Sequence, residues 1–359
     1  MDATVLLTMD RVPLLLTLAW GSSRAAISLA MVSAAWMLSG LTPSPLINGL
    51  LPAVASAPML LPFSARPRSG AALQLLAGLW LLLIAARLMP LPMAFTLAAV
   101  LLLALGCQLA DLPVQRLLTG SVGVPMAALR TSAEAGRLVG NTLAGVLFPI
   151  GKTLLQFSQA ILLLLPLAAL VTWLQAQHGD ADSPVPSMQA AAAGFQPAAL
   201  LQGLLFGGLF GLIPLWVRQE GAGNCFDFAM VLTAYGLGRA AAEALQGRLR
   251  LGFAPGYLLL MAALAGTQLL PGWGAVLLFV PLGLLAACSD QRLMQALGPA
   301  EDPAMRAQLF VRSACLGGLA GSLAMGLAGQ VLGLPGVLPI QLLAFAAGAP
   351  LMPRLLPAR

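Results

Sequence analysis

The residue best placed for binding chemistry is Arg24, which lies deep within an otherwise apolar stretch. It follows Trp20-Gly21-Ser22-Ser23 near the middle of a helix expected over 12–38. A guanidinium at this depth is costly in a membrane and usually faces a cavity or a partner. Its planar fork could bind a carboxylate or phosphate at two points. Two readings stay open: Arg24, with Trp20, binds a solute, or Arg24 pairs with an acid or carbonyls of a neighbouring helix.

Two glutamines could add hydrogen bonds to such a site. Gln108 lies in the apolar segment 92–110, and Gln202 lies in the apolar segment 198–217. A primary amide both donates and accepts, so either side chain could hold a polar solute. The alternative is a structural contact, because amides also join helices within membranes.

Four charged residues near expected helix ends form a second candidate set, a gate. Glu134 and Arg137 stand close together in one apolar segment, and Arg239 and Glu243 stand close together in another. Arg239 and Glu243 are four residues apart and can pair within one helix. Charges at wetted helix ends could also pair between helices, or could simply be solvated.

No set of residues typical of an enzyme competes with these candidates. The one histidine, His178, lies in a polar connection, and no Ser/His/Asp arrangement or phosphate-binding glycine loop with a following lysine can be drawn. We therefore expect no enzyme, no metal and no cofactor. The four cysteines lie in apolar segments and form no Cys-x-x-Cys or Cys/His cluster: Cys107, Cys225, Cys288 and Cys315.

The composition indicates whether the chain folds in water or in a lipid bilayer. It is 59% hydrophobic and 8% charged over 359 residues, whereas about 25% charged residues is usual in soluble domains. So few charges could not cover a water-soluble fold, which predicts an all-α polytopic protein of the lipid bilayer. The net charge of +6 comes from an arginine excess, which is typical of cytoplasmic loops and does not indicate a nucleic-acid partner.

Pro, Gly and charged residues divide the apolar sequence into twelve segments, each close to the 20 or so residues that cross a bilayer. With the N-terminus inside, only Arg87, Lys152 and Arg218 fall on the outer side, against twelve arginines on the inner side. This bias places both termini in the cytoplasm and supports the count. The predicted transmembrane helices are 12–38, 45–63, 71–89, 92–110, 132–151, 155–174, 198–217, 225–244, 253–270, 272–289, 308–329 and 333–352.

A short pattern occurs twice, about half a chain apart. Gln115-Arg116-Leu117-Leu118 recurs as Gln291-Arg292-Leu293-Met294, and Arg130 then falls on Arg306 without a gap. Such a repeat indicates a duplicated unit, and duplicated units are the usual building blocks of secondary transporters. The expected domains are an N-terminal six-helix bundle at 1–175, a cytoplasmic linker at 176–197 and a C-terminal six-helix bundle at 198–359.

Two six-helix halves, a central linker and cytoplasmic termini resemble the major facilitator superfamily over nearly the whole chain. That family carries the loop motif Gly-x-x-x-Asp-Arg-x-Gly-Arg-Arg after its second and eighth helices. Here these loops hold Arg66-x-Arg68 and Arg248-x-Arg250, without the aspartate and the first glycine. The resemblance implies that helices one, four, seven and ten line a central cavity, which would contain Arg24. It also implies that helices five and eight meet, which would bring the four gate residues together.

The fifth helix also carries glycines at a spacing similar to the glycine-rich motif of antiporters in that family. The spacing runs from Gly136 to Gly145, but the Gly-Pro step that should follow does not line up. Close packing of helices through small residues is the alternative.

These features predict a secondary transporter that moves a small solute, with an anion as the candidate, by alternating access. The coupling partner is left open between protons and a counter-ion. We expect a monomer in the bacterial inner membrane. The alternatives are a non-transporting assembly or pigment-delivery factor of the same fold and, less favoured, an enzyme or flippase acting on lipid. The acids near the spans are Asp111, Glu134, Asp227 and Glu243.

Overall fold

The computed structural model describes residues 11–61, 66–120, 122–178, 195–245, 251–270, 272–296 and 303–356. Within these ranges the secondary structure is helical, with no strand, because a helix satisfies its own backbone hydrogen bonds where water is absent. Eight helices of the described chain are long and apolar enough to cross a membrane, and two shorter apolar helices accompany them. The all-α membrane fold is thus confirmed, and the count of twelve spans stays a prediction.

The chain forms two compact units. Unit 1 contains Met1–Leu41 and Pro62–Met188, and unit 2 contains Thr42–Leu61 and Gln189–Arg359. The segment Thr42–Leu61 comes from the first half of the sequence but packs within unit 2. The division into two six-helix halves therefore stays a prediction about the duplicated sequence, and each unit is described by itself below.

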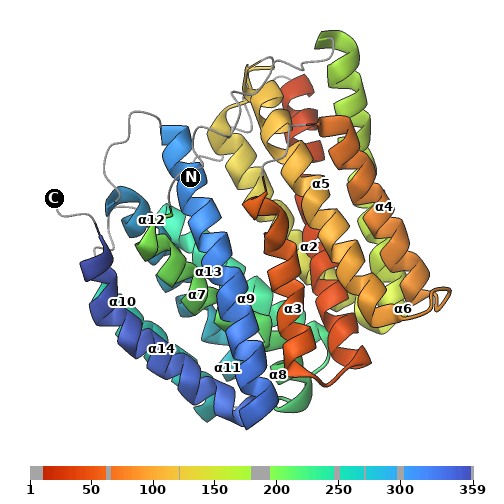
Figure 1. Cartoon of the computed structure of the whole chain (residues 1–359). Helices are drawn as coiled ribbons and strands as arrows, with labels where there is room; N and C mark the ends of the chain where they lie inside the picture. Colours follow the sequence, from red (N-terminus) through yellow and green to blue (C-terminus); the bar gives the residue numbers. More distant parts are fainter. Residues whose placement is uncertain are drawn as a thin grey trace. The chain divides into compact units, whose positions relative to one another are not determined.

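The described residues of unit 1 form four helices, which Figure 1 labels α2, α4, α5 and α6. Helix α2 packs along α6, and α4 packs against both α5 and α6. Helices α2 and α5 contact each other over a smaller area, but a polar contact described below joins them. The helices are α2 (Arg11–Leu41), α4 (Pro67–Ala85), α5 (Pro92–Gly120) and α6 (Met126–His178).

Helix α6 turns back on itself and supplies both the fifth and the sixth predicted spans. Leu129 and Leu167 lie in the same hydrophobic cluster, although a straight helix would separate residues 38 positions apart by about 57 Å. The side chain of Gln156 donates to the carbonyl of Ala144 across the bend. The turn therefore falls between these two residues, around Pro149, where the sequence predicts it.

Unit 2 contains the remaining helices. Helix α7 packs along α13, α9 along α12, α10 along α14, and α3 along α13. Those helices are α3 (Pro45–Ser56), the 3-10 turn η1 (Ala57–Leu60), α7 (Pro197–Gly211), α8 (Ile213–Gln219), α9 (Cys225–Ala244), α10 (Phe253–Leu269), α11 (Trp273–Leu277), α12 (Phe279–Ala296), α13 (Pro303–Leu332) and α14 (Leu334–Leu355).

Glycines set the close approach of the main helix pair in each unit. A Cβ on Gly136 or Gly140 of α6 would overlap a backbone carbonyl oxygen of α2. In unit 2, a Cβ on Gly317 or Gly321 of α13 would overlap a carbonyl oxygen of α7 in the same way. The packing explanation for the glycines of the fifth helix is therefore supported. The same pairing, first helix with fifth helix of each half, occurs in both units, as a duplication predicts.

The predicted segments coincide in position with the observed helices, but several of their ends differ. Each of the twelve overlaps a helix or a pair of short helices. Helix α6 continues to His178, so it extends into the predicted linker 176–197, of which 179–194 lie outside the described residues. Arg248 and Arg250, which belong to the predicted loop motif, also lie outside them.

Candidate functional site

Arg24 forms a two-point ion pair with Asp111 inside unit 1. Nη1 of Arg24 donates to Oδ2 of Asp111 at 2.7 Å, and Nη2 donates to Oδ1. The two helices that hold the pair, α2 and α5, are apolar over most of their length, so each charge has the other as its main compensation. Of the two readings that the sequence leaves open, pairing with an acid of a neighbouring helix is the one observed. Solute binding by Arg24 stays a prediction.

The indole of Trp20 supports the guanidinium from one face. Cζ of Arg24 lies 4.0 Å from the centroid of the Trp20 ring, one helical turn earlier on α2, a cation–π geometry. Trp20 is 1% exposed and Arg24 is 8% exposed, whereas the side chain of Asp111 is 25% exposed. The exposed part of the ion pair is therefore on the side of Asp111, while the ring of Trp20 covers one face of the Arg24 guanidinium.

Two further polar side chains extend this site along α5 and α4. Cys107 precedes Asp111 by one turn of α5, and Nε2 of Gln74 on α4 donates to its sulfur at 3.6 Å. Gln74 is completely buried. We call Trp20, Arg24, Gln74, Cys107 and Asp111 the Arg24 cluster.

Unit 2 contains a comparable polar network, built around Asp290 of α12. Nη1 of Arg239, on α9, lies 3.0 Å from Oδ2 of Asp290, and the amide of Gln202, on α7, donates to Oδ1. The hydroxyl of Ser289 in turn donates to Oε1 of Gln202 at 2.8 Å. Arg239 also lies over the ring of Tyr235, at 5.9 Å from its centroid. Each unit therefore holds a charged pair between two of its helices.

The structure adds a partner to the expected charge pairing, because Arg239 pairs with Asp290. The side chain of Glu243 lies outside the described residues, so its pairing with Arg239 stays a prediction. The sequence reasoning missed Asp290 because it ended the tenth helix at residue 289, at the edge of the apolar run. Helix α12 continues to Ala296, since backbone hydrogen bonds do not require apolar side chains. The position of Asp290, directly before the repeated Gln291-Arg292 pattern, is the signal that could have found it.

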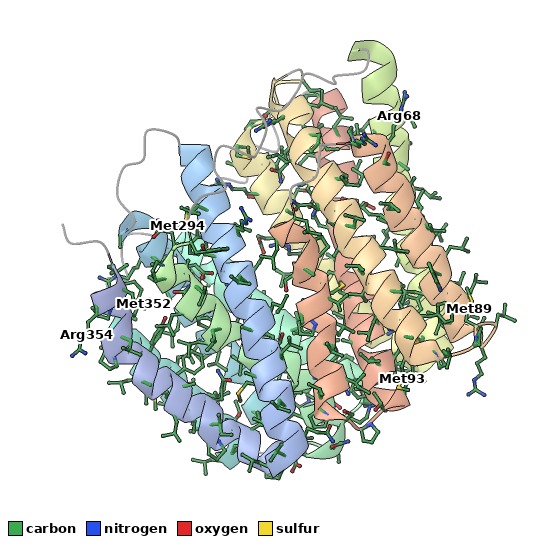
Figure 2. The ribbon with its side chains drawn as sticks, viewed as in Figure 1. Arg68, Met89, Met93, Met294, Met352 and Arg354 are labelled. Carbon is green, nitrogen blue, oxygen red and sulfur yellow. The ribbon has the colours of Figure 1, made fainter. Side chains whose placement is uncertain are left out.

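The other candidate residues have simpler surroundings. Oε1 of Glu134 accepts from Nη1 of Arg137 at 2.5 Å within α6, and gating by these two residues stays a prediction. Gln108 is half-buried on α5. Arg354, by contrast, is exposed near the end of α14 and points away from it (Figure 2). No group of three or more His, Cys, Asp or Glu side chains in the described ranges could hold a metal ion.

Comparison with known proteins gives a structural match without a sequence match. No family model matches the chain, and no curated protein does. A bacterial homologue of the iron transporter ferroportin, in an inward-facing state, matches with a TM-score of 0.71 at 14% identity, over 99% of both chains.

Two other solved transporters match over similar lengths. The nucleoside transporter NupG has a TM-score of 0.68 at 11% identity, over 96% of this chain and all of that chain. A POT family transporter in complex with 5-aminolevulinic acid has a TM-score of 0.68 at 10% identity, over 96% of both chains. These neighbours are transporters and not enzymes, as the sequence predicts for this chain. The chain has the fold of these transporters, which is the fold that its resemblance to the major facilitator superfamily implies.

Proposed function

We propose that this chain is a secondary transporter that moves a small, anionic solute across a membrane by alternating access. The fold supports transport, because full-length matches include a nucleoside transporter, a bacterial homologue of an iron transporter and a POT family transporter in complex with 5-aminolevulinic acid. Solutes so different show that the fold by itself does not select one. The choice of solute depends on the polar side chains that this chain places among its helices.

The observation that carries the proposal is the ion pair of Arg24 and Asp111. Burying two charges costs several kcal/mol per ion, and well-packed apolar side chains usually stabilise the same site at least as well. A charged pair within a membrane helix bundle therefore points to a role in binding or coupling. The guanidinium of Arg24 supplies N–H donors that an anionic solute would share with Asp111.

Several features of the proposal extend the sequence predictions. The carrier would act as a monomer in a bacterial inner membrane, with both termini in the cytoplasm and with a proton or a counter-ion as coupling partner. The two halves, 1–175 and 198–359, would alternate around the solute. Gln108 and Gln202 would contribute hydrogen bonds to it, and the predicted gate of Glu134, Arg137, Arg239 and Glu243 would close the cytoplasmic side.

The test is flux through the purified protein in proteoliposomes. A panel of organic anions, neutral solutes and cations would be offered to the wild type, to Arg24→Met and to the paired variant Arg24→Met/Asp111→Leu. We expect uptake of at least one anion by the wild type and its loss in both variants. Arg354→Ala, which removes an exposed arginine, should transport like the wild type.

The alternative function gives a different result. If the folded wild type moves no solute of the panel under a proton or counter-ion gradient, the proposal of transport is wrong and a non-transporting assembly factor is favoured. If only neutral or cationic solutes move, transport stands and the anionic solute is wrong.

A further inference from the structure

One edge of the Arg24 guanidinium has no partner. Asp111 occupies the end of the fork through Nη1 and Nη2, whereas Nε is buried and has no hydrogen-bond partner. A guanidinium offers a second pair of donors along the edge that contains Nε. Arg24 can therefore bind a second carboxylate there while Asp111 keeps its place.

Two more buried polar atoms of the Arg24 cluster also lack partners. The indole Nε1 of Trp20, which can only donate, has none, and Oε1 of Gln74, which can only accept, has none. Both residues are at least 99% buried. A buried polar atom without a partner costs about 1–3 kcal/mol, so a ligand that completes these bonds would be favoured.

The network of unit 2 differs in this respect. Each oxygen of Asp290 has a partner, and the amide of Gln202 both donates and accepts. Among the described side chains, no buried polar atom of Gln202, Ser289 or Asp290 lacks a partner. Among the described side chains next to this network, the hydroxyl of Tyr257, which lies beside Ser289, is buried without a hydrogen-bond partner. The Arg24 cluster holds three such atoms, one of them on a cation, and this larger number points to unit 1 as the place where the ligand binds.

The pattern of the three atoms defines a chemical class. Two N–H donors, one of them on a cation, select an anionic acceptor group and disfavour a cation. A separate acceptor, Oε1 of Gln74, selects a hydroxyl or amino donor on the same ligand. Gln74 contacts Cys107, which lies one turn of α5, about 6 Å, from Asp111. The donor group and the anionic group of a small ligand could therefore reach Gln74 and Arg24 together.

We infer that the solute is a small carboxylic acid that also carries a hydroxyl or amino group, held by Arg24 and Trp20 at the carboxylate and by Gln74 at the donor. The inference rests on the proposed transport function. It adds the class of solute and assigns the recognition of the donor group to Gln74.

Binding to the full chain in nanodiscs would be measured by calorimetry, with four-carbon probes that differ in one group. Butyrate carries the carboxylate alone, 4-hydroxybutyrate and 2-hydroxybutyrate add a hydroxyl, and 1,4-butanediol lacks the carboxylate. We expect at least one hydroxy acid to bind about tenfold more tightly than butyrate, because butyrate leaves Gln74 unpaired. The diol should not bind measurably.

Three variants assign the contacts. Gln74→Leu should remove the preference for the hydroxy acid while butyrate binds as in the wild type. Trp20→Phe, which keeps a ring beneath Arg24, should weaken all carboxylates about fivefold. Arg24→Lys keeps the charge but loses the Nε edge, and should abolish carboxylate binding. Gln219→Leu makes the same replacement as Gln74→Leu at an exposed position and should change nothing.

The outcomes separate the two proposals. A hydroxy-acid preference that survives Gln74→Leu, or the absence of carboxylate binding by a protein that transports other solutes, overturns the inference and leaves transport in place. Absence of transport of every solute overturns the proposed function. Thermal unfolding shows whether Gln74→Leu folds. If it does not, Trp20→Phe tests the inference instead, because it removes the indole N–H donor. Unchanged carboxylate affinity in Trp20→Phe overturns the inference.

Discussion

Arg24 of α2 and Asp111 of α5 are joined at two points, with 2.7 Å between Nη1 and Oδ2. The pair lies 87 positions apart in the sequence and connects two helices that otherwise contact each other lightly. The two members are buried to different degrees, since the side chain of Arg24 is 9% exposed and that of Asp111 is 25% exposed. This difference makes their contributions to stability unequal.

Removing Asp111 should destabilise the protein more than removing Arg24. Asp111→Leu leaves a buried guanidinium without compensation, at a cost of about 3–5 kcal/mol, whereas Arg24→Met leaves a carboxylate that is less deeply buried. The double variant Arg24→Met/Asp111→Leu should be more stable than Asp111→Leu alone. Reversible unfolding in mixed detergent micelles measures all three. Additive losses in the double variant would show that the pair is not coupled.

Glycines 136 and 140 should be essential for folding. In either Gly136→Ala or Gly140→Ala the new methyl group overlaps a carbonyl oxygen of α2, so the pair α2–α6 must separate. We expect a loss of folded protein in detergent, measured by size-exclusion chromatography. Gly256→Ala is the matched control, because nothing lies within 4 Å of its Cβ position. Equal yields of the two kinds of variant would contradict the packing described.

The contact of α3 with α13 should depend on Gly49. A Cβ at Gly49 would lie 2.6 Å from the carbonyl oxygen of Ser322, and Ser44 donates to Oε1 of Gln330 at 2.8 Å at the end of the same pair. A cross-link in Ser44→Cys/Gln330→Cys, made with a short thiol-specific linker after replacing the native cysteines, should therefore form, and adding Gly49→Leu should suppress it. Unchanged cross-linking after Gly49→Leu would place α3 elsewhere.

Gln202 should contribute more to stability than Ser289. Gln202→Leu removes a hydrogen bond to a charged group and another to a hydroxyl, at a combined cost of about 1–3 kcal/mol. Ser289→Ala removes only the second bond, and should cost no more than about 1 kcal/mol. Thermal unfolding of the purified variants gives the order. A reversed order would show that Asp290 does not rely on the amide of Gln202.

The gate remains a prediction from the sequence and can be tested by exchanging charges. Glu134→Arg together with Arg239→Glu should restore transport that each single change weakens, because exposed pairs of about 0–1 kcal/mol can form and break within a transport cycle. Arg239→Glu alone should be the weaker single variant, since it places a second carboxylate beside Asp290. If the double variant transports no faster than the slower single variant, these residues do not form a gate and are solvated charges at helix ends.

The sequence by itself determined that the chain is an all-α membrane protein and where its helices lie. A chain with 8% charged residues must satisfy its backbone internally in lipid, so its apolar runs become helices whatever their neighbours are. The fold-back near Pro149 and the burial of Arg24 were also readable, because a turn and a charge within an apolar run are local features of the chain.

Only the tertiary structure decided which residues complete each site. Asp111 and Asp290 were not distinguished from other acids near helix ends, because the partner of an acid depends on helices 87 or 88 positions away. The grouping of Thr42–Leu61 with unit 2 was hidden for the same reason. Helix positions follow from the solvent that each residue meets, whereas helix partners follow from how side chains such as Gly49 and Gly136 fit the surface of another helix.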